Sequence, residues 1–330
     1  MGSSSGPERN YAKEWGIPFK SIPTGKLRRY FSLNNAIDAV KVPLGVLKSL
    51  RIIAFFRPDV IFSKGGYPAV PVMIAGRILR KPVIIHDSDA EPGLTTRIAK
   101  RFAKKILFGY PEAAKKFPKK QSVVTGIPIR DEIFKGGIKQ GLDLTGFTAA
   151  KPVILIMGGS LGAQSINKAI EQALPDLLKF TQIIHVTGRG KSLKHIPGRA
   201  KGHIGKYKSF EYVDQELPHL YAISNLVIGR AGANSIAEIQ ALKKPSVLIP
   251  LGPPVSHGDQ LANAKVLHDR GGCVVIQDRD LSPEKLTKTL KQILSDPRMQ
   301  KRMSRKAYHP FNPKAAGRIA KILLAEAKKK

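Results

Sequence analysis

Apolar and β-branched residues gather in short runs along this chain, and most of the runs end in a glycine or a polar turn. They lack the alternation that marks a strand with one solvated face, so they are typical of strands buried on both faces. Helical patterns such as GLTTRIAKRFAKKI and SINKAIEQALPDLLKF lie between them. The runs are DVIFSKGG (59–66), PVIIHDSDAEPG (82–93), VVTGIPIR (123–130), PVILIMGGSLGA (152–163), QIIHVTGRG (182–190), LVIGRAGA (226–233), SVLIPLGP (246–253) and CVVIQD (273–278). Strands that alternate with helices in this way predict an α/β fold with parallel sheets.

Length and one stretch without periodicity predict two domains. At 330 residues the chain exceeds what one hydrophobic core usually organises. Around 131–151 the sequence is rich in glycine and charge, and we expect a linker at 136–150 between domains over 1–135 and 151–311. The final segment, 312–330, has apolar residues at helical spacing, and we expect this helix to pack back on the first domain.

The composition narrows the classes of partner. A net charge of +32 and a pI of about 10.3 favour polyanions, namely nucleic acid, anionic lipid or phosphorylated substrates, although charge runs are also ordinary solvated faces. The single cysteine, Cys273, rules out an intramolecular disulfide and a cysteine-based metal site. No apolar run approaches the ~20 residues that cross a bilayer. The opening MGSSSG has no apolar region typical of a signal peptide, and it also fits the remnant of a tag.

Loops that follow the predicted strands are the candidate sites, because ligands of parallel sheets bind beyond the carboxyl ends of the strands. In MGGSLGAQSINKAI (157–170), glycines and Ser160 precede a helix whose amides suit a diphosphate. The loop matches neither the Walker motif nor the dinucleotide fingerprint, and a purely structural turn is the alternative.

Acidic and amide side chains follow two further strands. Glu238 falls in the first turns of the helix after Gly232, where a carboxylate either caps the helix or accepts the hydroxyls of a ribose. In PLGPPVSHGDQLANAKVL (250–267), Asp259 and Gln260 can bind sugar hydroxyls, whereas His257 is more typical of a surface histidine.

The first half of the chain offers a second set of polar loops. Lys64 with the amides of Gly65 and Gly66 can hold another phosphate, and Arg130 can offset charge on a departing diphosphate. His86 ends a buried strand, where a structural histidine with satisfied hydrogen bonds is an equal interpretation. The sequence has no HExxH motif or carboxylate cage, so we expect no bound metal.

Taken together, these loops resemble the MurG family, bacterial transferases that add N-acetylglucosamine (GlcNAc) from UDP-GlcNAc to lipid I and so make the peptidoglycan precursor lipid II. The resemblance covers nearly the whole chain. It rests on GIPFKSIPTGKLRRYFSLNNAIDAVKV, RPDVIFSKGGYPAVPVMIAGRILRKPVIIHDSDAEPGLTTRIAKRFAKKI, VTGIPIRDEIF, VILIMGGSLGAQSIN, IGRAGANSIAEIQALKKPSVLIPL and GDQLANA. It implies two Rossmann-like domains of the glycosyltransferase-B fold, with the donor bound mainly by the second domain and no cofactor.

The resemblance also implies roles for individual residues on the donor side. Ser160 would meet the donor diphosphate with Arg130 beside it, and Val213 would contact uracil. Glu238 would hold the ribose hydroxyls, and Gln260 with Asp259 would read the sugar. The loop under the nucleotide would comprise Ala233, Asn234, Ser235, Ile236 and Ala237. On the acceptor side, the family has asparagine or an acid at the position of Asp89, and Lys64, Gly65 and Gly66 match the loop that receives the lipid diphosphate.

One departure from the family pattern concerns catalysis. Members begin with a strand, a GGTGGH loop and a helix, whereas this sequence starts after them, so we expect a truncated first domain and identify no catalytic histidine. The competing explanations are a truncated gene model, an inactive donor-binding scaffold, and half of a two-chain transferase. The mechanism implied is inversion: a base deprotonates the acceptor 4-hydroxyl, which attacks the anomeric carbon opposite the departing UDP.

The lipid acceptor gives the positive charge a purpose. The resemblance implies UDP-GlcNAc, lipid I and an anionic membrane surface as partners, with peripheral attachment at the cytoplasmic face of the plasma membrane. Basic segments such as Thr95 to Ile106 and LRIIAFFR (50–57) can face that surface, although we expect Phe55 and Phe56 to be core. We expect no nucleic-acid partner, because the chain has no recognised nucleic-acid motif and an aromatic content of 7%.

Overall fold

The structure, a computed structural model, shows two compact units. It describes residues 1–330 except 5, 7, 26–33, 160–161, 194–201, 204, 254–255, 257, 308–313 and 329–330, and for 34–40 the backbone alone. The first unit comprises Met1–Gly126 and Lys314–Lys330, and the second comprises Ile127–Pro313. None of the helices in the described parts of the chain is long and apolar enough to cross a membrane.

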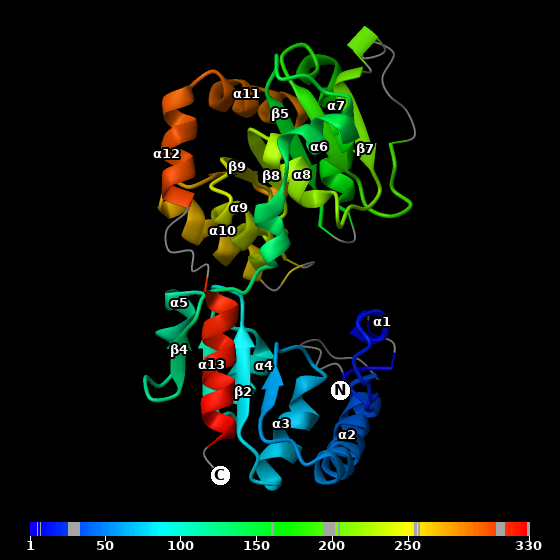
Figure 1. The fold of residues 1–330 in the computed structure, drawn as a ribbon, viewed down its shortest axis with the longest axis vertical. Coiled ribbons are helices and arrows are strands. Elements are labelled where there is room, and N and C mark those ends of the chain that lie inside the picture. Colours follow the sequence, from blue (N-terminus) through cyan, green and yellow to red (C-terminus); the bar gives the residue numbers. More distant parts are fainter. Residues whose placement is uncertain are drawn as a thin grey trace. The chain divides into compact units, whose positions relative to one another are not determined.

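The first unit is built on a parallel sheet in the order β1-β2-β3-β4. Its strands are β1 (Ile61–Ser63), β2 (Val83–Asp87), β3 (Lys105–Phe108) and β4 (Ser122–Val124). Its helices are α1 (Glu8–Glu14), α2 (Asn34–Phe56), α3 (Ala69–Ile78), α4 (Leu94–Ala99), α5 (Pro111–Ala114) and α13 (Ala315–Ala327). Every residue of β2 is buried, including the polar His86 and Asp87 at its end. Figure 1 shows this strand with α13 beside it.

Helix α13 returns to the sheet of the first unit. Ile319 packs with Ile84 of β2 and Leu107 of β3 in one hydrophobic cluster. At the far end of the helix, the buried carboxylate of Glu326 pairs with Lys104 Nζ at 2.7 Å. The apolar face of this helix is therefore covered by strands that lie more than 200 residues earlier in the chain.

Two expectations for the first unit are wrong. The helical pattern over 93–106 ends early, because α4 stops at Ala99 and Lys105 and Ile106 already belong to β3, where Ile106 is buried. Phe55 and Phe56 are not core residues: their exposed fractions are 92% and 75%. They end α2, beyond the packed turn that buries Ile53.

The second unit contains a six-stranded parallel sheet in the order β10-β9-β8-β5-β6-β7. Its strands are β5 (Val153–Met157), β6 (Gln182–Val186), β7 (Tyr207–Phe210), β8 (Leu226–Gly229), β9 (Ser246–Leu248) and β10 (Val274–Val275). Its helices are α6 (Ile138–Thr145), α7 (Gln164–Leu177), α8 (Leu217–Ile223), α9 (Ala233–Ala241), α10 (Asp259–Asp269), α11 (Pro283–Leu294), α12 (Pro297–Ala307) and the 3-10 turns η1 (Asp131–Lys135) and η3 (Asp278–Asp280).

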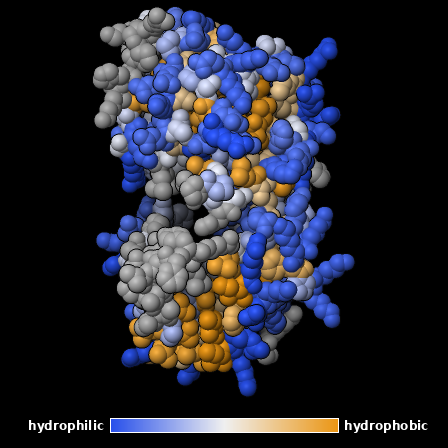
Figure 2. Space-filling model, turned by 180° about the vertical axis from the view of Figure 1, so that it is seen from behind, coloured by the Kyte–Doolittle hydropathy of each residue, from blue (hydrophilic) through white to orange (hydrophobic). Residues whose placement is uncertain are grey.

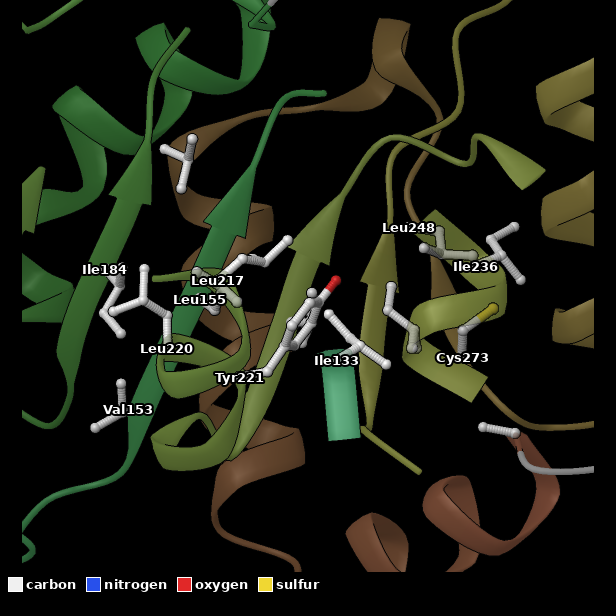
Figure 3. Close-up of a cluster of buried hydrophobic side chains, with 14 of the residues drawn as sticks. Ile133, Val153, Leu155, Ile184, Leu217, Leu220, Tyr221, Ile236, Leu248 and Cys273 are labelled. Atoms are coloured by element: carbon white, nitrogen blue, oxygen red, sulfur yellow. The ribbon is translucent and has the colours of Figure 1, made fainter. Parts of the chain in front are cut away.

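Strand β5 is central, and its side chains alternate between two hydrophobic clusters, one on each face of the sheet. Val153 and Leu155 join a cluster with Tyr221 of α8 and Ile236 of α9, shown in Figure 3. Ile154 and Ile156 point into the cluster built with α7 and α11. Because both faces are buried, the strand carries no polar alternation. The strand order reverses beside β5, which is where ligands of such sheets bind.

The structure divides the chain at 126/127, and the segment 136–150 contains helix α6 inside the second unit. Two of its glycines, Gly136 and Gly141, serve close packing on α8 and not the freedom of a linker. A Cβ on Gly136 would lie 2.0 Å from the carbonyl oxygen of Pro218, and one on Gly141 would lie 2.5 Å from that of His219. Glycine and charge in this segment therefore reflect a tight helix contact and an exposed outer face.

Candidate functional site

The loop from β5 to α7 brings backbone amides to the carboxyl edge of the second sheet. Gly159 and Gly162 have φ values of +84° and +69°, which favour glycine. A Cβ on Gly158 would lie 2.3 Å from Ala163 N, so glycine is required there as well. Helix α7 starts at Gln164 without a side-chain cap. Ser160, the predicted contact for the diphosphate, lies outside the described residues.

The loop from β8 to α9 is fixed by the buried guanidinium of Arg230. Its Nη1 donates to Ile249 O at 3.0 Å and to Asp278 Oδ1 at 2.6 Å, and its Nη2 donates to Ser165 Oγ at 2.7 Å. Ser165 Oγ also donates to the same Asp278 oxygen at 2.7 Å. This network joins the starts of α7 and α9 to η3. Sequence reasoning did not single out Arg230 or Asp278.

The predicted nucleotide loop forms the first turns of α9. Asn234 is exposed and Ser235 is half-buried, whereas the side chains of Ala233, Ile236 and Ala237 are buried. Ile236 belongs to the apolar cluster with Tyr221 (Figure 3). From this loop, a ligand would therefore meet backbone amides and the two polar side chains.

Glu238 lies in the second turn of α9, and α9 has no side-chain cap at its start. The Tyr221 hydroxyl donates to Glu238 Oε2 at 3.3 Å. Burial raises the pKa of the Glu238 carboxyl, while the charge of Arg130 and the hydrogen bond from Tyr221 lower it. The structure thus removes capping as the role of Glu238 and leaves a carboxylate that is hydrogen-bonded to a hydroxyl and subject to the charge of Arg130.

Arg130 precedes η1 and donates through Nη1 to the carboxylate of Asp214. This hydrogen bond raises the pKa of the Arg130 guanidinium. Val213, predicted to contact uracil, adjoins Asp214 and is nearly buried in the cluster with Tyr221. The structure therefore brings Arg130, Val213 and Glu238 into one region of the second unit, together with Asp214 and Tyr221, which the sequence did not single out.

Asp259 and Gln260 open α10 and both hold the loop before it. Gln260 Oε1 accepts from Leu251 N at 3.0 Å, and Asp259 Oδ1 accepts from Ser256 Oγ at 2.7 Å. One turn later, the buried Asn263 donates to Ala231 O at 3.2 Å, which ties α10 to the loop before α9. His257 lies outside the described residues.

In the first unit, Lys64, His86 and Ser88 form a cluster at the carboxyl ends of β1 and β2. Lys64 Nζ lies 2.9 Å from His86 Nδ1 and donates to Ser88 Oγ at 2.8 Å. Burial lowers the pKa of Lys64, while Asp87 and Asp89 oppose that shift. Gly65 and Gly66, which follow Lys64, have φ values of +88° and +82°. The predicted acceptor-side residues Lys64, Gly65, Gly66 and Asp89 therefore follow the carboxyl ends of two neighbouring strands, β1 and β2.

The loop after β2 is shaped by the buried carboxylate of Asp87. Its Oδ1 accepts from Asp89 N at 3.0 Å, and its Oδ2 accepts from Gly93 N at 3.2 Å. Among the residues that the structure describes, no group of three or more His, Cys, Asp and Glu could hold a metal ion. The described polar groups offer amides, an ammonium and carboxylates, which suit phosphates and hydroxyls.

Comparisons with known proteins agree with this arrangement. The Glycosyltransferase family 28 C-terminal domain matches residues 153–319, and the Glycosyltransferase family 28 N-terminal domain matches residues 1–108. A Bacillus cereus protein named UDP-N-acetylglucosamine--N-acetylmuramyl-(pentapeptide) pyrophosphoryl-undecaprenol N-acetylglucosamine transferase 2 is 45% identical over 304 residues, 91% of this chain and 84% of that protein. A Lachnospira eligens transferase, whose name lacks only the final number, is 43% identical over 90% of this chain and 82% of its own length.

Solved structures agree as well. The crystal structure of MurG from Acinetobacter baumannii has 25% identity and a TM-score of 0.77, covering 98% of this chain and 89% of that one. The UDP-GlcNAc 2-epimerase of Neisseria meningitidis, solved with UDP-GlcNAc, shares the fold with a TM-score of 0.65 at 13% identity, covering 97% of this chain and 88% of that one. The resemblance predicted from the sequence is confirmed: the chain belongs to glycosyltransferase family 28 as a member of the MurG family, with the two parallel-sheet domains of the glycosyltransferase-B fold.

Proposed function

We propose that this chain transfers GlcNAc from UDP-GlcNAc to the 4-hydroxyl of the N-acetylmuramoyl sugar in lipid I, with inversion, and so makes lipid II. The observation that carries the proposal is identity of 45% along 91% of the chain to a protein named for this transfer. The local geometry supports it, because amide-rich helix starts and a hydrogen-bonded carboxylate gather at the edge of the second sheet.

The donor lies along the second unit in this proposal. The starts of α7 and α9 face the diphosphate, which Arg130 joins from the segment before η1. Uracil packs at Val213, and the ionised Glu238 accepts both ribose hydroxyls. Asp259 and Gln260 meet the sugar, supported by their positions in the first turn of α10. A helix start and a guanidinium both favour the negative charge of a diphosphate.

The acceptor diphosphate lies at Lys64, Gly65 and Gly66, with Asp89 beside them. An ammonium carries three N–H donors, and contacts to His86 and Ser88 account for two of them among the described residues. The third N–H and the glycine loop are available in this proposal to phosphate oxygens, and the positive φ of both glycines turns the backbone sharply beside Lys64.

The chemistry is a displacement at the anomeric carbon. The acceptor 4-hydroxyl loses its proton to a base and forms the new C–O bond, while the bond to the β-phosphate oxygen breaks on the opposite face. UDP leaves with the electron pair, and its charge is stabilised by the helix starts and by Arg130. In this proposal the fold fixes the starts of α7 and α9 before the reaction, so little reorganisation of these amides is needed when the charge develops.

The first unit also provides a surface for an anionic membrane in this proposal. Phe55, Phe56 and Trp15 are 92%, 75% and 74% exposed, and Arg51 and Arg57 flank the phenylalanine pair. Figure 2 shows hydrophobic residues gathered beside hydrophilic ones in the lower part of the view. Exposed aromatic and basic side chains together favour a charged lipid interface, where each basic residue contributes about 1 kcal/mol.

Vesicle sedimentation tests the membrane surface. The chain should pellet with vesicles of phosphatidylglycerol more than with vesicles of phosphatidylcholine, and Phe55→Ser/Phe56→Ser should reduce pelleting. Ile138→Ser is the control, because Ile138 is an exposed apolar residue in α6 of the second unit. Equal pelleting of the double variant and the parent would contradict this part of the proposal.

Transfer of radiolabelled GlcNAc from UDP-GlcNAc to a lipid I analogue tests the function itself. We expect labelled lipid product from the parent chain and loss of product with Glu238→Ala. Calorimetry with UDP separates the steps: saturable binding without any transfer would reduce the proposal to a donor-binding scaffold, and no binding would overturn it.

A further inference from the structure

Tyr221 connects the core of the second unit to the donor site. The residue is fully buried in α8 and packs among Leu217, Leu220 and Ile236. Figure 3 shows its ring within the apolar cluster and its oxygen at the upper end of the ring, the end toward which the arrows of the strands point. A buried tyrosine hydroxyl needs a hydrogen-bond partner. Here the partner is the carboxylate of Glu238, at 3.3 Å.

The ionised carboxylate can only accept hydrogen bonds, so the shared hydrogen belongs to Tyr221. Burial and the neighbouring carboxylate raise the pKa of Tyr221 well above its usual value, which keeps this donor protonated. The tyrosine ring is fixed by the core, whereas a glutamate side chain has three rotatable bonds. The contact therefore limits the directions in which the Glu238 carboxylate can point.

The ribose diol presents two adjacent hydroxyl donors, and a carboxylate meets both only when it is ionised and correctly oriented. We propose that Tyr221 is the positioning residue for ribose recognition: its hydroxyl holds the Glu238 carboxylate toward the 2′- and 3′-hydroxyls of the donor, an inference that rests on the proposed function. Tyr221 touches no reacting atom. It acts through Glu238, and its effect is specific to ribonucleotides.

The pH dependence gives this role a signature. Tyr221 faces the carboxylate from α8 and Arg130 faces it from the segment before η1, while Asp214 and Tyr212 act on Arg130. Removal of the Tyr221 hydroxyl raises the pKa of Glu238 further, because the ionised form loses a donor. Glu238 then takes up a proton at a higher pH, and UDP binding is lost earlier as the pH falls.

Calorimetry with UDP and 2′-deoxy-UDP on the full chain tests the inference. Tyr221→Phe should weaken UDP binding about tenfold at pH 7 and more at pH 5.5, since a hydrogen bond to a charged group is lost. It should change 2′-deoxy-UDP binding much less. In a Glu238→Gln background, Tyr221→Phe should not change UDP affinity further. The glutamine amide does not titrate, and it provides no charged carboxylate for the Tyr221 hydroxyl to orient.

Tyr207→Phe is the matched control. It removes another tyrosine hydroxyl of the second unit, one that lies 3.1 Å from His185 Nδ1, and should leave UDP affinity unchanged. Circular dichroism confirms that each variant is folded. If the parent binds UDP and Glu238→Gln weakens binding while Tyr221→Phe matches the parent at both pH values, the inference fails and the proposed function survives. Absence of UDP binding by the parent would overturn both.

Discussion

Lys64 Nζ lies 2.9 Å from His86 Nδ1, and the opposite ring nitrogen, His86 Nε2, lies 2.9 Å from Gly126 O. A carbonyl can only accept, so Nε2 carries the ring hydrogen and Nδ1 accepts from the ammonium. Burial and the charge of Lys64 lower the pKa of His86 to about 4, which keeps the ring neutral at physiological pH. The neutral ring in turn holds the Lys64 ammonium at the sheet edge.

Replacement of Lys64 by methionine should impair use of the lipid acceptor and leave the donor untouched. Loss of one charge-assisted contact to a diphosphate corresponds to about a tenfold to hundredfold rise in the acceptor KM. Transfer kinetics with a lipid I analogue measure that KM, and calorimetry with UDP measures donor affinity. The exposed Lys115→Met in the same unit serves as the control. An unchanged acceptor KM would contradict the role of Lys64.

Acid should destabilise both units through two buried histidines. Burial lowers the pKa of His86 and of His185 to about 4, against about 6.5 when unfolded. Between these values the unfolded chain binds protons that the folded chain does not. The free energy of unfolding therefore suffers no loss from these histidines above pH 6.5. It falls as the pH drops toward 4, by about 2 kcal/mol per histidine at pH 5.

Urea unfolding at pH 7 and pH 5 measures this loss, and His185→Gln separates the contributions. His185 donates from Nε2 to Asn167 Oδ1 at 3.0 Å, so glutamine retains a donor. The variant will be less stable at pH 7, yet the second unit should lose less stability between the two pH values than in the parent. The same pH slope in both chains would show that His185 does not cause the loss.

The hydrophobic pattern predicted most strands correctly because a strand buried on both faces leaves an unbroken apolar run. The exceptions are β3, whose first two residues were included in the helix predicted over 93–106, and β7, an edge strand with the sequence YKSF, whose two central residues are exposed. A strand that is only partly covered has no such run, and sequence reasoning missed it. Helix α6 was missed for a related reason, since Gly136 and Gly141 suggest a linker until their contact with α8 is seen.

Local sequence identified the loops that we propose to carry the site, but not the side chains that hold those loops. Glycine-rich turns after strands have a local signal. In the sequence, Tyr221 looks like an ordinary aromatic residue of the core. Arg230 donates a hydrogen bond to Asp278, which lies 48 residues later in the chain. Such pairs depend on which strand ends are neighbours, and the order of strands in the sheet is not encoded in any short segment.

Arg230→Met should destabilise the second unit. After the change, Asp278 Oδ1 keeps only the hydrogen bond from Ser165 Oγ among these contacts, and Ile249 O loses its donor. We expect the free energy of unfolding to fall by about 2 kcal/mol. This is less than for a fully buried ion pair, because Asp278 is partly exposed. Urea denaturation measures it. Arg230→Met/Asp278→Asn should recover part of the loss, because the carboxylate is then no longer uncompensated. A double variant less stable than the single one would contradict this account.

Arg130 should act mainly on the diphosphate of the donor. In the proposed site its guanidinium offsets phosphate charge, so Arg130→Met should weaken UDP binding about tenfold and uridine binding much less, since uridine is affected only through the pKa of Glu238. Calorimetry with both ligands measures the difference, and added salt should reduce it.

Asp214→Asn is the informative companion, since it removes the ion pair that holds Arg130 in this structure. Both partners are about half exposed, so the pair itself contributes little stability, and its removal should leave UDP affinity equal or higher. If Arg130→Met weakened uridine and UDP equally, Arg130 would support the loop structure and the diphosphate would lie elsewhere.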